Sequence, residues 1–379
     1  MNQSVKTIRR RAVFYISGFD PRGARHYHTL YKEESAKQTA INGMKLEVGP
    51  RQKLQEHIHH WTVNSEETHT DYHVLGWDDL VRNHWISKPL TLAWRSLQAY
   101  WHVIVTGALW RAGQVNMAPM LTYLYPLALM LLLALVSYIT GGIVAGLLPA
   151  PFAILTWLLK IGIAAGCFAV GMRLMEKLHV YWLLRIFCFG SGQAKAHLSE
   201  SVERTDYFAD FIATKLHTES YDEILLIGHS VGTILLPMMG EKLLTDHPDL
   251  LEKPITFITL GQCVPLVSFM PESEPCRKAL RFMARQPLQW LDLAAPPDGV
   301  SFSLTGPFKE ICEPGALKLR CASPRFHSLL DMSTYNRIKR NKFRMHFQYL
   351  MAGDKAGKYD YFLLTAGDQP LVLKDDVRL

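Results

Sequence analysis

A serine between glycines stands at the junction of a predicted strand and a predicted helix. The segment GHSVG, residues 228–232, follows the apolar run 224–227 and precedes a helical pattern at 233–244. Glycines on both sides of a serine allow a sharp turn that larger side chains would prevent, and this leaves the hydroxyl at its tip. The N-terminus of the following helix directs N–H groups and partial positive charge towards an oxyanion formed there. The pattern therefore predicts that Ser230 is a nucleophile in acyl transfer.

The motif and its setting resemble the nucleophile elbow of the α/β-hydrolase superfamily, particularly its lipases and esterases. The resemblance covers residues 11–80 and 199–352 and leaves out the stretch between them. It implies a second oxyanion donor in a glycine-containing loop after an early strand. The matching loop here is FYISGFDPRG, so the backbone N–H of Phe19 would join that of Val231 in an oxyanion hole. Lipases commonly carry His-Gly in this loop, whereas this chain has Ser17-Gly18.

The resemblance also implies an orienting acid and then a histidine base, both after the serine in the chain. Asp298 is the favoured acid because it lies in a Pro-Pro-Asp-Gly turn after the predicted strand 289–293, where sites of α/β proteins are built. Asp292, inside that strand, is the alternative acid. His346 is the favoured base because it opens an aromatic helical stretch, and His327 is the alternative.

A long stretch of the chain carries no charged side chain. Between Arg111 and Lys160 there is no Asp, Glu, Lys or Arg, and one helical crossing of a bilayer needs only about 20 apolar residues. Two spans are predicted, at 117–140 and 152–172, and the glycines and prolines between them predict a tight turn. We therefore expect a transmembrane helical hairpin; a pair of buried core helices is the alternative.

Basic residues flank the hairpin, and the predicted turn carries none. They are Arg95 and Arg111 before the first span, and Arg173, Lys177 and Arg185 after the second. By the positive-inside rule, both flanks are expected on the cytoplasmic side of the cell (inner) membrane. No export signal is expected, because the apolar run after the first arginines soon meets an aspartate.

Aromatic residues stand in both flanks, on apolar stretches compatible with helices. They are Trp94, Trp101 and Trp110 before the hairpin, and His179, Tyr181 and Trp182 after it. Such residues are enriched at the headgroup level of membranes, so we expect short interfacial helices. Packing of these aromatics in an ordinary core is the alternative.

The composition fits a folded chain with an apolar insertion. Of 379 residues, 49% are hydrophobic and 20% are charged, which excludes disordered and collagen-like chains. Outside the hairpin, apolar runs alternate with helical patterns, as in an α/β fold with a mostly parallel sheet. The predicted strands are 12–17, 72–75, 224–227, 255–260, 289–293 and 317–321. We expect one α/β-hydrolase domain, residues 1–87 and 199–379, interrupted by a membrane insertion at 88–198.

Other groups of polar residues suggest binding sites, but simpler interpretations are favoured. The histidines of HIHHWTV have no carboxylate or cysteine at a recognisable ligand spacing, so we expect a polar strand edge and no metal. Asp79 and Arg82 are spaced for a structural i,i+3 ion pair. The basic run 335–344 suits anionic headgroups or a solvated helix face better than nucleic acid, to which we expect no binding.

Together these features predict a membrane-anchored serine hydrolase. Ser230 would be the nucleophile, His346 the general base and Asp298 the orienting acid, with Phe19 and Val231 forming the oxyanion hole. We expect an acyl-enzyme mechanism, without a cofactor, that cleaves lipid acyl esters at the cytoplasmic membrane surface. An acyltransferase with the same acyl-enzyme is one alternative, and a non-catalytic membrane-bound interaction module is another.

Overall fold

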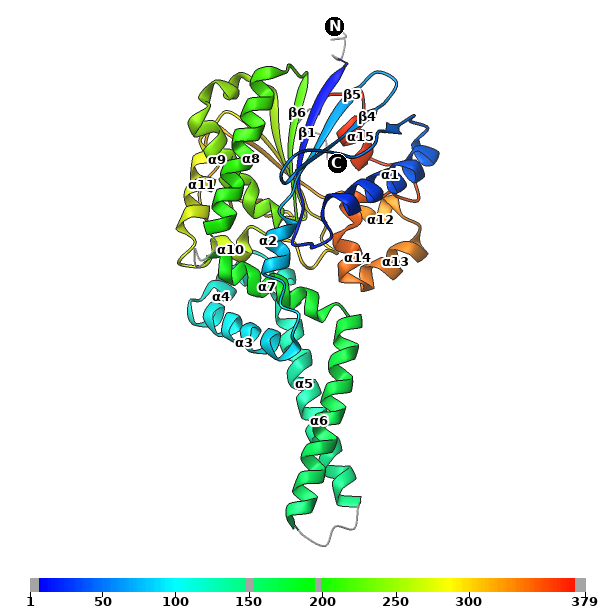
Figure 1. Cartoon of the computed structure of the whole chain (residues 1–379), viewed down its shortest axis with the longest axis vertical. Helices are drawn as coiled ribbons and strands as arrows, with labels where there is room; N and C mark the ends of the chain where they lie inside the picture. The colour runs from blue at the N-terminus through cyan, green and yellow to red at the C-terminus, as the bar shows by residue number, and fades with distance from the viewer. Residues whose placement is uncertain (1–6, 148–152, 195–198, 372–379) are drawn as a thin grey trace.

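The computed structural model describes residues 7–147, 153–194 and 199–371. It has a body built on one mixed, mostly parallel sheet with helices on both faces, and a long pair of helices projects from one end (Figure 1). The strands are β1 (Arg10–Ile16), β2 (Glu47–Val48), β3 (Gln52–Gln55), β4 (Ile58–Asn64), β5 (His69–Leu75), β6 (Glu223–His229), β7 (Ile255–Leu260), β8 (Gln289–Leu293) and β9 (Lys318–Ala322).

The helices fall into a group inserted between β5 and β6 and a group that covers the sheet. The inserted group is α2 (Asp78–Asn83), α3 (Pro89–Val105), α4 (Ala108–Val115), α5 (Met117–Leu147), α6 (Ala153–Lys177), α7 (Val180–Ala194) and α8 (Ser199–Thr218), of which α8 also covers the sheet. The others are α1 (Gly23–Asn42), α9 (Gly232–Asp246), α10 (Pro265–Ser268), α11 (Glu274–Ala284), α12 (Phe326–Leu329), α13 (Met332–Arg340), α14 (Lys342–His346) and α15 (Tyr361–Ala366). Two short 3-10 turns, Pro248–Glu252 and Gln348–Leu350, complete the described elements.

The strand order places a topological switch point in the middle of the sheet. The order is β2-β4-β5-β1-β6-β7-β8-β9, with β3 paired to β4. β1 pairs in parallel with β5 on one side and with β6 on the other, so the chain moves in opposite directions from β1. The carboxyl ends of β1 and β6 therefore lie together, and such a reversal is where α/β proteins place their sites.

The predicted α/β fold with a mostly parallel sheet is confirmed. All six predicted strands are present as β1 and β5–β9, with ends that differ by up to three residues. The histidine-rich segment forms β4, which pairs antiparallel with β5. β2 and β3 were not predicted; both are short, polar strands at the sheet edge.

Side chains of β1 alternate between the two cores that the sheet separates. Phe14 and Ile16 belong to the core under α8 and α9. Tyr15 belongs to the opposite core, where its ring centroid lies 5.4 Å from that of Tyr27 on α1. Because both faces of β1 are covered, the loop that follows this strand starts from a fixed position.

The two predicted apolar helices are present as α5 and α6, which pack along each other and project from the body (Figure 1). Both are long and apolar enough to cross a membrane. Only 11% of the most apolar window of α5 is buried, and none of that of α6. A pair of buried core helices would have most of these residues covered, so the exposure of α5 and α6 does not fit that alternative.

The predicted end of the first helix is wrong. α5 does not stop at Thr140 but continues through Gly141 and Gly142 to Leu147. A Cβ on Gly141 would lie 2.5 Å from the carbonyl oxygen of Lys160, so this glycine allows α5 and α6 to approach closely. α6 likewise extends past the predicted 172 to Lys177, and the predicted Pro-Ala-Pro turn and residue 152 lie outside the described residues.

The flanking aromatics divide into two groups. Before the hairpin, Trp94, Trp101 and Trp110 are exposed, by 61%, 70% and 71%. After it, Tyr181 and Trp182 on α7 are buried in the core, so the alternative interpretation holds for that flank. α7 packs between α3 and α10 and joins the helix pair to the body.

The paired carboxylates that follow β5 have different partners from those predicted. Asp79 forms a two-pronged ion pair with Arg204 of α8, at 2.8 and 2.7 Å. Arg82 pairs instead with Asp78, one turn earlier on α2. The expected pair between Asp79 and Arg82 is therefore wrong, because a residue from another helix occupies both oxygens of Asp79.

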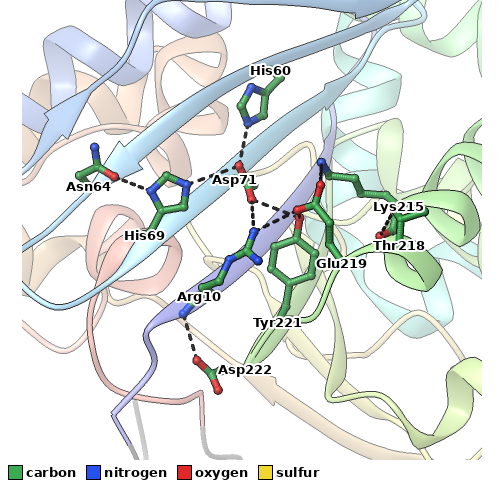
Figure 2. A network of polar contacts seen from close by, with 10 residues as sticks. All are labelled: Arg10, His60, Asn64, His69, Asp71, Lys215, Thr218, Glu219, Tyr221 and Asp222. Atoms are coloured by element: carbon green, nitrogen blue, oxygen red, sulfur yellow. Dashed lines mark hydrogen bonds and ion pairs between the residues drawn. The ribbon is translucent and has the colours of Figure 1, made fainter.

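Figure 2 shows a polar network at the amino ends of β1 and β5, opposite the switch point. At its centre, Asp71 accepts hydrogen bonds from Tyr221 at 3.1 Å and Arg10 at 3.4 Å, and its other oxygen lies 3.0 Å from Nε2 of His60. Burial alone would raise the pKa of Asp71, but the hydrogen bond and charge of His60, with other nearby histidines, more than offset this and lower it.

We expect Asp71→Asn to lower the free energy of unfolding by about 3 kcal/mol at pH 7, because the largely buried His60 and the partly exposed Arg10 lose their anionic partner. Folding lowers the pKa of this carboxyl, so the carboxylate stabilises the folded protein fully at pH values above its pKa in the unfolded chain, near 4. This stabilisation is lost as the pH falls through the pKa in the folded protein. The difference between wild type and variant should therefore shrink below about pH 4. Denaturant unfolding of the detergent-solubilised protein at several pH values measures it.

Glu219→Gln is the matched control, since Glu219 shares Arg10 and Tyr221 with Asp71 but its side chain is 31% exposed. We expect it to cost less than about 1 kcal/mol. A difference for Asp71→Asn that stays constant down to pH 3 would contradict an ionised Asp71 in the folded protein.

Candidate active site

Ser230 occupies the turn between β6 and α9, at the switch point of the sheet. Its φ is 56°, in the left-handed region that residues other than glycine seldom adopt. A Cβ on Gly232 would lie 2.5 Å from the carbonyl oxygens of both Ile16 and Ser17, and one on Gly228 would lie 2.9 Å from the Gly232 carbonyl oxygen. The expected sharp turn is therefore present, and side chains at either glycine would force it apart.

The loop after β1 lies directly against this serine. A Cβ on Gly18 would come within 2.8 Å of the Ser230 Cβ and 3.1 Å of its Oγ. The loop is held from outside by Trp77, whose indole N–H donates to the Ser17 carbonyl at 2.9 Å, and by the ring of Phe19, which packs on that of Phe189 at 4.6 Å. These contacts fix the backbone that follows Gly18.

Phe19 and Val231 lie on the two chain segments that meet at Ser230. Phe19 follows Gly18 in the loop after β1, and Val231 follows the serine. Within residues 7–147, 153–194 and 199–371, neither backbone N–H donates a hydrogen bond. Two unengaged donors beside one hydroxyl are the chemical requirement for an oxyanion hole.

Asp298 and His346 form a buried pair. Nδ1 of His346 lies 2.8 Å from Oδ2 of Asp298, and both side chains are fully buried. Tyr349 donates to the same oxygen at 3.0 Å, and the Val300 N–H donates to the other at 3.2 Å. Burial alone would raise the pKa of Asp298, but the charge and hydrogen bond of His346 more than offset this and lower it. An ionised carboxylate only accepts, so Nδ1 carries a proton, and Nε2 is the ring nitrogen left for proton transfer.

Nε2 of His346 is buried and makes no hydrogen bond in the described part of the chain. The segment that carries His346 is also tied to the serine turn, because His229 Nε2 lies 2.9 Å from the His346 carbonyl oxygen. Burial, and then the charge of His346, lowers the pKa of His229 to about 3. His229 is therefore neutral and donates this bond, beside the serine and not as its base.

The alternative acid and base lie apart from each other and from this pair. Asp292 is buried within β8, where it accepts a hydrogen bond from Thr259 Oγ1 at 2.6 Å, and burial raises its pKa to about 7. His327 is exposed on α12, and its ring lies against that of Tyr335. The structure thus brings together Asp298 and His346 and separates their alternatives.

Two further residues near the site were not predicted from the sequence. Tyr123 reaches from α5 into the body and donates to the Val300 carbonyl at 3.1 Å, in the loop that holds Asp298. Cys263 follows β7 and is fully buried. Burial and the charge of Asp298 raise the pKa of its thiol to about 12, although hydrogen bonds with Tyr123 and Ser230 act to lower it. The thiol is therefore protonated. No local pattern connects Tyr123 with a loop far along the chain.

The histidines in and next to β4 and β5 make polar contacts with carboxylates. His60 and His69 share Asp71, and His57 lies 3.8 Å from Asp79. Among the described residues, one group brings three potential metal-binding atoms together: His217, His247 and Asp249. It lies at the carboxyl ends of α8 and α9, at the opposite end of β6 from Ser230.

Comparisons of the chain with protein-family models, curated proteins and solved structures gave no match.

Proposed function

We propose that this protein is a membrane-anchored serine hydrolase of the α/β-hydrolase type that cleaves acyl esters of lipids. The observation that carries the proposal is the buried hydrogen bond between His346 and Asp298, which leaves Nε2 of His346 unengaged at the sheet edge where Ser230 occupies its strained turn. Along the chain, the nucleophile Ser230 follows β6, the acid Asp298 follows β8, and the base His346 comes last. Triads on this fold take the same order.

In the proposed reaction, Oγ of Ser230 attacks the acyl carbonyl carbon while Nε2 of His346 takes the hydroxyl proton. The N–H groups of Phe19 and Val231 bind the negative oxygen of the tetrahedral intermediate. His346 then gives its proton to the leaving alcohol as the ester C–O bond breaks. A water, activated by the same nitrogen, releases the acid and restores Ser230. Asp298 holds the ring in the required tautomer and stabilises the imidazolium.

The exposed apolar surface supports a membrane anchor. The 31 residues of α5 extend about 45 Å at 1.5 Å per residue, which exceeds the roughly 30 Å of a bilayer's hydrocarbon core. The single charge in the middle of the pair, Lys160, faces the partner helix, with its Nζ 4.0 Å from the ring centroid of Tyr138 and 4.9 Å from that of Trp157. Such aromatic contacts lower the cost of placing an ammonium in an apolar region.

α3 extends this apolar surface sideways from the base of the pair (Figure 1). Its exposed apolar residues recur on one face, at Leu90, Trp94, Leu97, Trp101 and Ile104. This is the pattern of a helix that lies in the membrane interface, and tryptophan favours that depth. By the positive-inside rule, the basic flanks of the pair favour the cytoplasmic side for the body. The proposed site would then open close to the lipid headgroups.

The test is labelling of the detergent-solubilised protein with a fluorophosphonate, which reacts with activated serines. We expect one adduct, on the peptide that contains Ser230, and none in Ser230→Ala. Ser268→Ala is the matched control, because Ser268 is also buried and its hydroxyl makes no hydrogen bond in the described chain. Folded wild-type protein with an unmodified Ser230 would show that the proposed function is wrong.

A further inference from the structure

A cavity of about 560 Å³ lies where the apolar helix pair joins the body, between the start of α5, the junction of α6 with α7, and α13. Figure 1 shows these elements meeting at the base of the projecting pair. Four cationic side chains line the cavity: Lys177, Arg337, Arg340 and Lys342. No carboxylate is among the lining residues.

These four cations stand out because they lack partners. In the part of the chain that the structure describes, none of their side chains makes an ion pair or a hydrogen bond. Elsewhere on the body, exposed basic residues such as Lys37 and Lys278 pair with nearby carboxylates. Four unpaired cations around one cavity repel each other, and an anion inside it relieves that repulsion.

Apolar side chains also line the cavity and form its apolar wall. They are Leu121 and Tyr125 of α5, Leu178 between α6 and α7, and Trp182 and Leu183 at the start of α7. This wall continues into the exposed surface of α5, where Leu131, Leu132 and Leu135 are more than half exposed. A ligand with an anionic head and an apolar tail fits both walls.

The cavity shares a wall with the proposed active site. The ring of Trp182, which lines the cavity, lies 5.8 Å from that of His346. A Cβ on Gly299, the residue after Asp298, would lie 2.4 Å from Oγ1 of Thr122 and 3.5 Å from Nζ of Lys342, both cavity residues. Trp182 therefore lies between the cavity and His346, and Gly299 lies between Lys342 and Asp298.

We propose that this cavity binds the phosphate of an anionic glycerophospholipid drawn from the membrane, and that such a lipid is the substrate. The guanidinium of an arginine binds two phosphate oxygens through parallel hydrogen bonds. We therefore expect Arg337 and Arg340 to make the main contacts with the phosphate. This inference rests on the proposed function. Ser230 Oγ forms a bond to the acyl carbon, the bond from that carbon to the glycerol oxygen breaks, and the serine proton passes through His346 to that oxygen. Water then releases the fatty acid, so the products are a lysophospholipid and a fatty acid.

The first experiment compares phosphatidylglycerol with a diacylglycerol of the same acyl chains in mixed micelles. We expect the wild type to prefer the phospholipid by about 10-fold or more in kcat/KM, and Arg337→Gln/Arg340→Gln to lower turnover of the phospholipid by at least about 10-fold. Lys339→Gln is the matched control: Lys339 is exposed on the same helix but does not line the cavity, and both rates should stay unchanged. Turnover of diacylglycerol without preference for the phospholipid would overturn the inference and leave the proposed function standing.

A second experiment measures binding without turnover, by native mass spectrometry of the Ser230→Ala protein in detergent. We expect it to retain one phosphatidylglycerol, and the further change Arg337→Gln/Arg340→Gln to release it. Inorganic phosphate at millimolar concentration should not displace the lipid; displacement would mean that free phosphate, and not a membrane lipid, is the ligand, and would overturn the inference. Failure of the proposed function is seen separately, as an unlabelled Ser230.

Discussion

Asp298→Asn is expected to lower kcat/KM for a soluble ester by on the order of 10⁴-fold, whereas Asp292→Asn should leave it within about threefold. Asp298 is ionised and accepts the Nδ1 proton of His346 at 2.8 Å. An amide in its place presents an N–H as readily as a carbonyl, so the ring can take the other tautomer and lose its free Nε2. Initial rates in detergent micelles give the comparison.

Asp292→Asn is a stringent control for Asp298→Asn, because both aspartates are fully buried and only six positions apart. Their surroundings nevertheless shift their pKa values in opposite directions, upward for Asp292 and downward for Asp298. With a pKa raised to about 7, Asp292 is largely protonated below neutral pH, so asparagine replaces a neutral group that Thr259 can still bond. A raised carboxyl pKa makes the folded state lose stability as the pH rises from about 4 to 7, so Asp292→Asn should gain thermal stability relative to wild type over that range. Loss of activity in Asp292→Asn alone would reverse the assignment of the acid.

The turn at Ser230 could be predicted because its requirements are local. A strand, two glycines and a helix start are all visible in twenty consecutive residues, and the close approach of Gly232 to Ile16 and Ser17 then follows from the sheet. The choice of Asp298 over Asp292 could also be argued locally, since residues after a strand reach the sheet edge and residues inside it do not.

The contacts of the inserted helices could not be predicted, because they join segments without a shared local pattern. Thr122 reaches Gly299, and Tyr123 reaches Val300, across more than 170 residues of sequence. The role of Gly141 could not be predicted either. A glycine at this point of the sequence suggests a turn, but Gly141 lies at a close contact between α5 and α6. Glycine permits both, and only the position of α6 decides between them.

The aromatic flanks give a similar lesson. Trp101 and Trp182 both stand in apolar helices next to the hairpin, and composition does not distinguish them. Trp182 is buried because its ring packs on those of Phe343 and His346 of α14, whereas no element in the described part of the chain covers Trp101 of α3, which is 70% exposed. The exposure of a helix face depends on which other elements pack on it, and the sequence of the helix alone does not determine this.

His346→Ala is expected to lower kcat/KM by on the order of 10⁴-fold or more, comparable to removal of the nucleophile, while His327→Ala should change it by less than about threefold. His346 is fully buried, with one ring nitrogen fixed by Asp298 and the other unengaged. His327 is exposed, and its ring centroid lies 6.2 Å from that of Tyr335. Without a base, the serine hydroxyl keeps its proton and reacts slowly, so fluorophosphonate labelling of Ser230 should slow with ester hydrolysis.

The alanine variant also removes one of the donors to the buried Asp298, which keeps only the Tyr349 hydroxyl and the Val300 N–H among the donors described above. This loss costs about 3 kcal/mol or more, enough to unfold a protein of marginal stability. His346→Gln separates the two effects, because an amide N–H can still bond to Asp298 but offers no basic nitrogen. We expect this variant to fold, to remain as inactive as His346→Ala, and not to recover at high pH. In folded His346→Ala, added imidazole should restore part of the activity, since the lost ring leaves a space beside the serine turn. A folded, active His346→Gln would show that another group removes the Ser230 proton, and the exposed His327 would then be the next candidate to test.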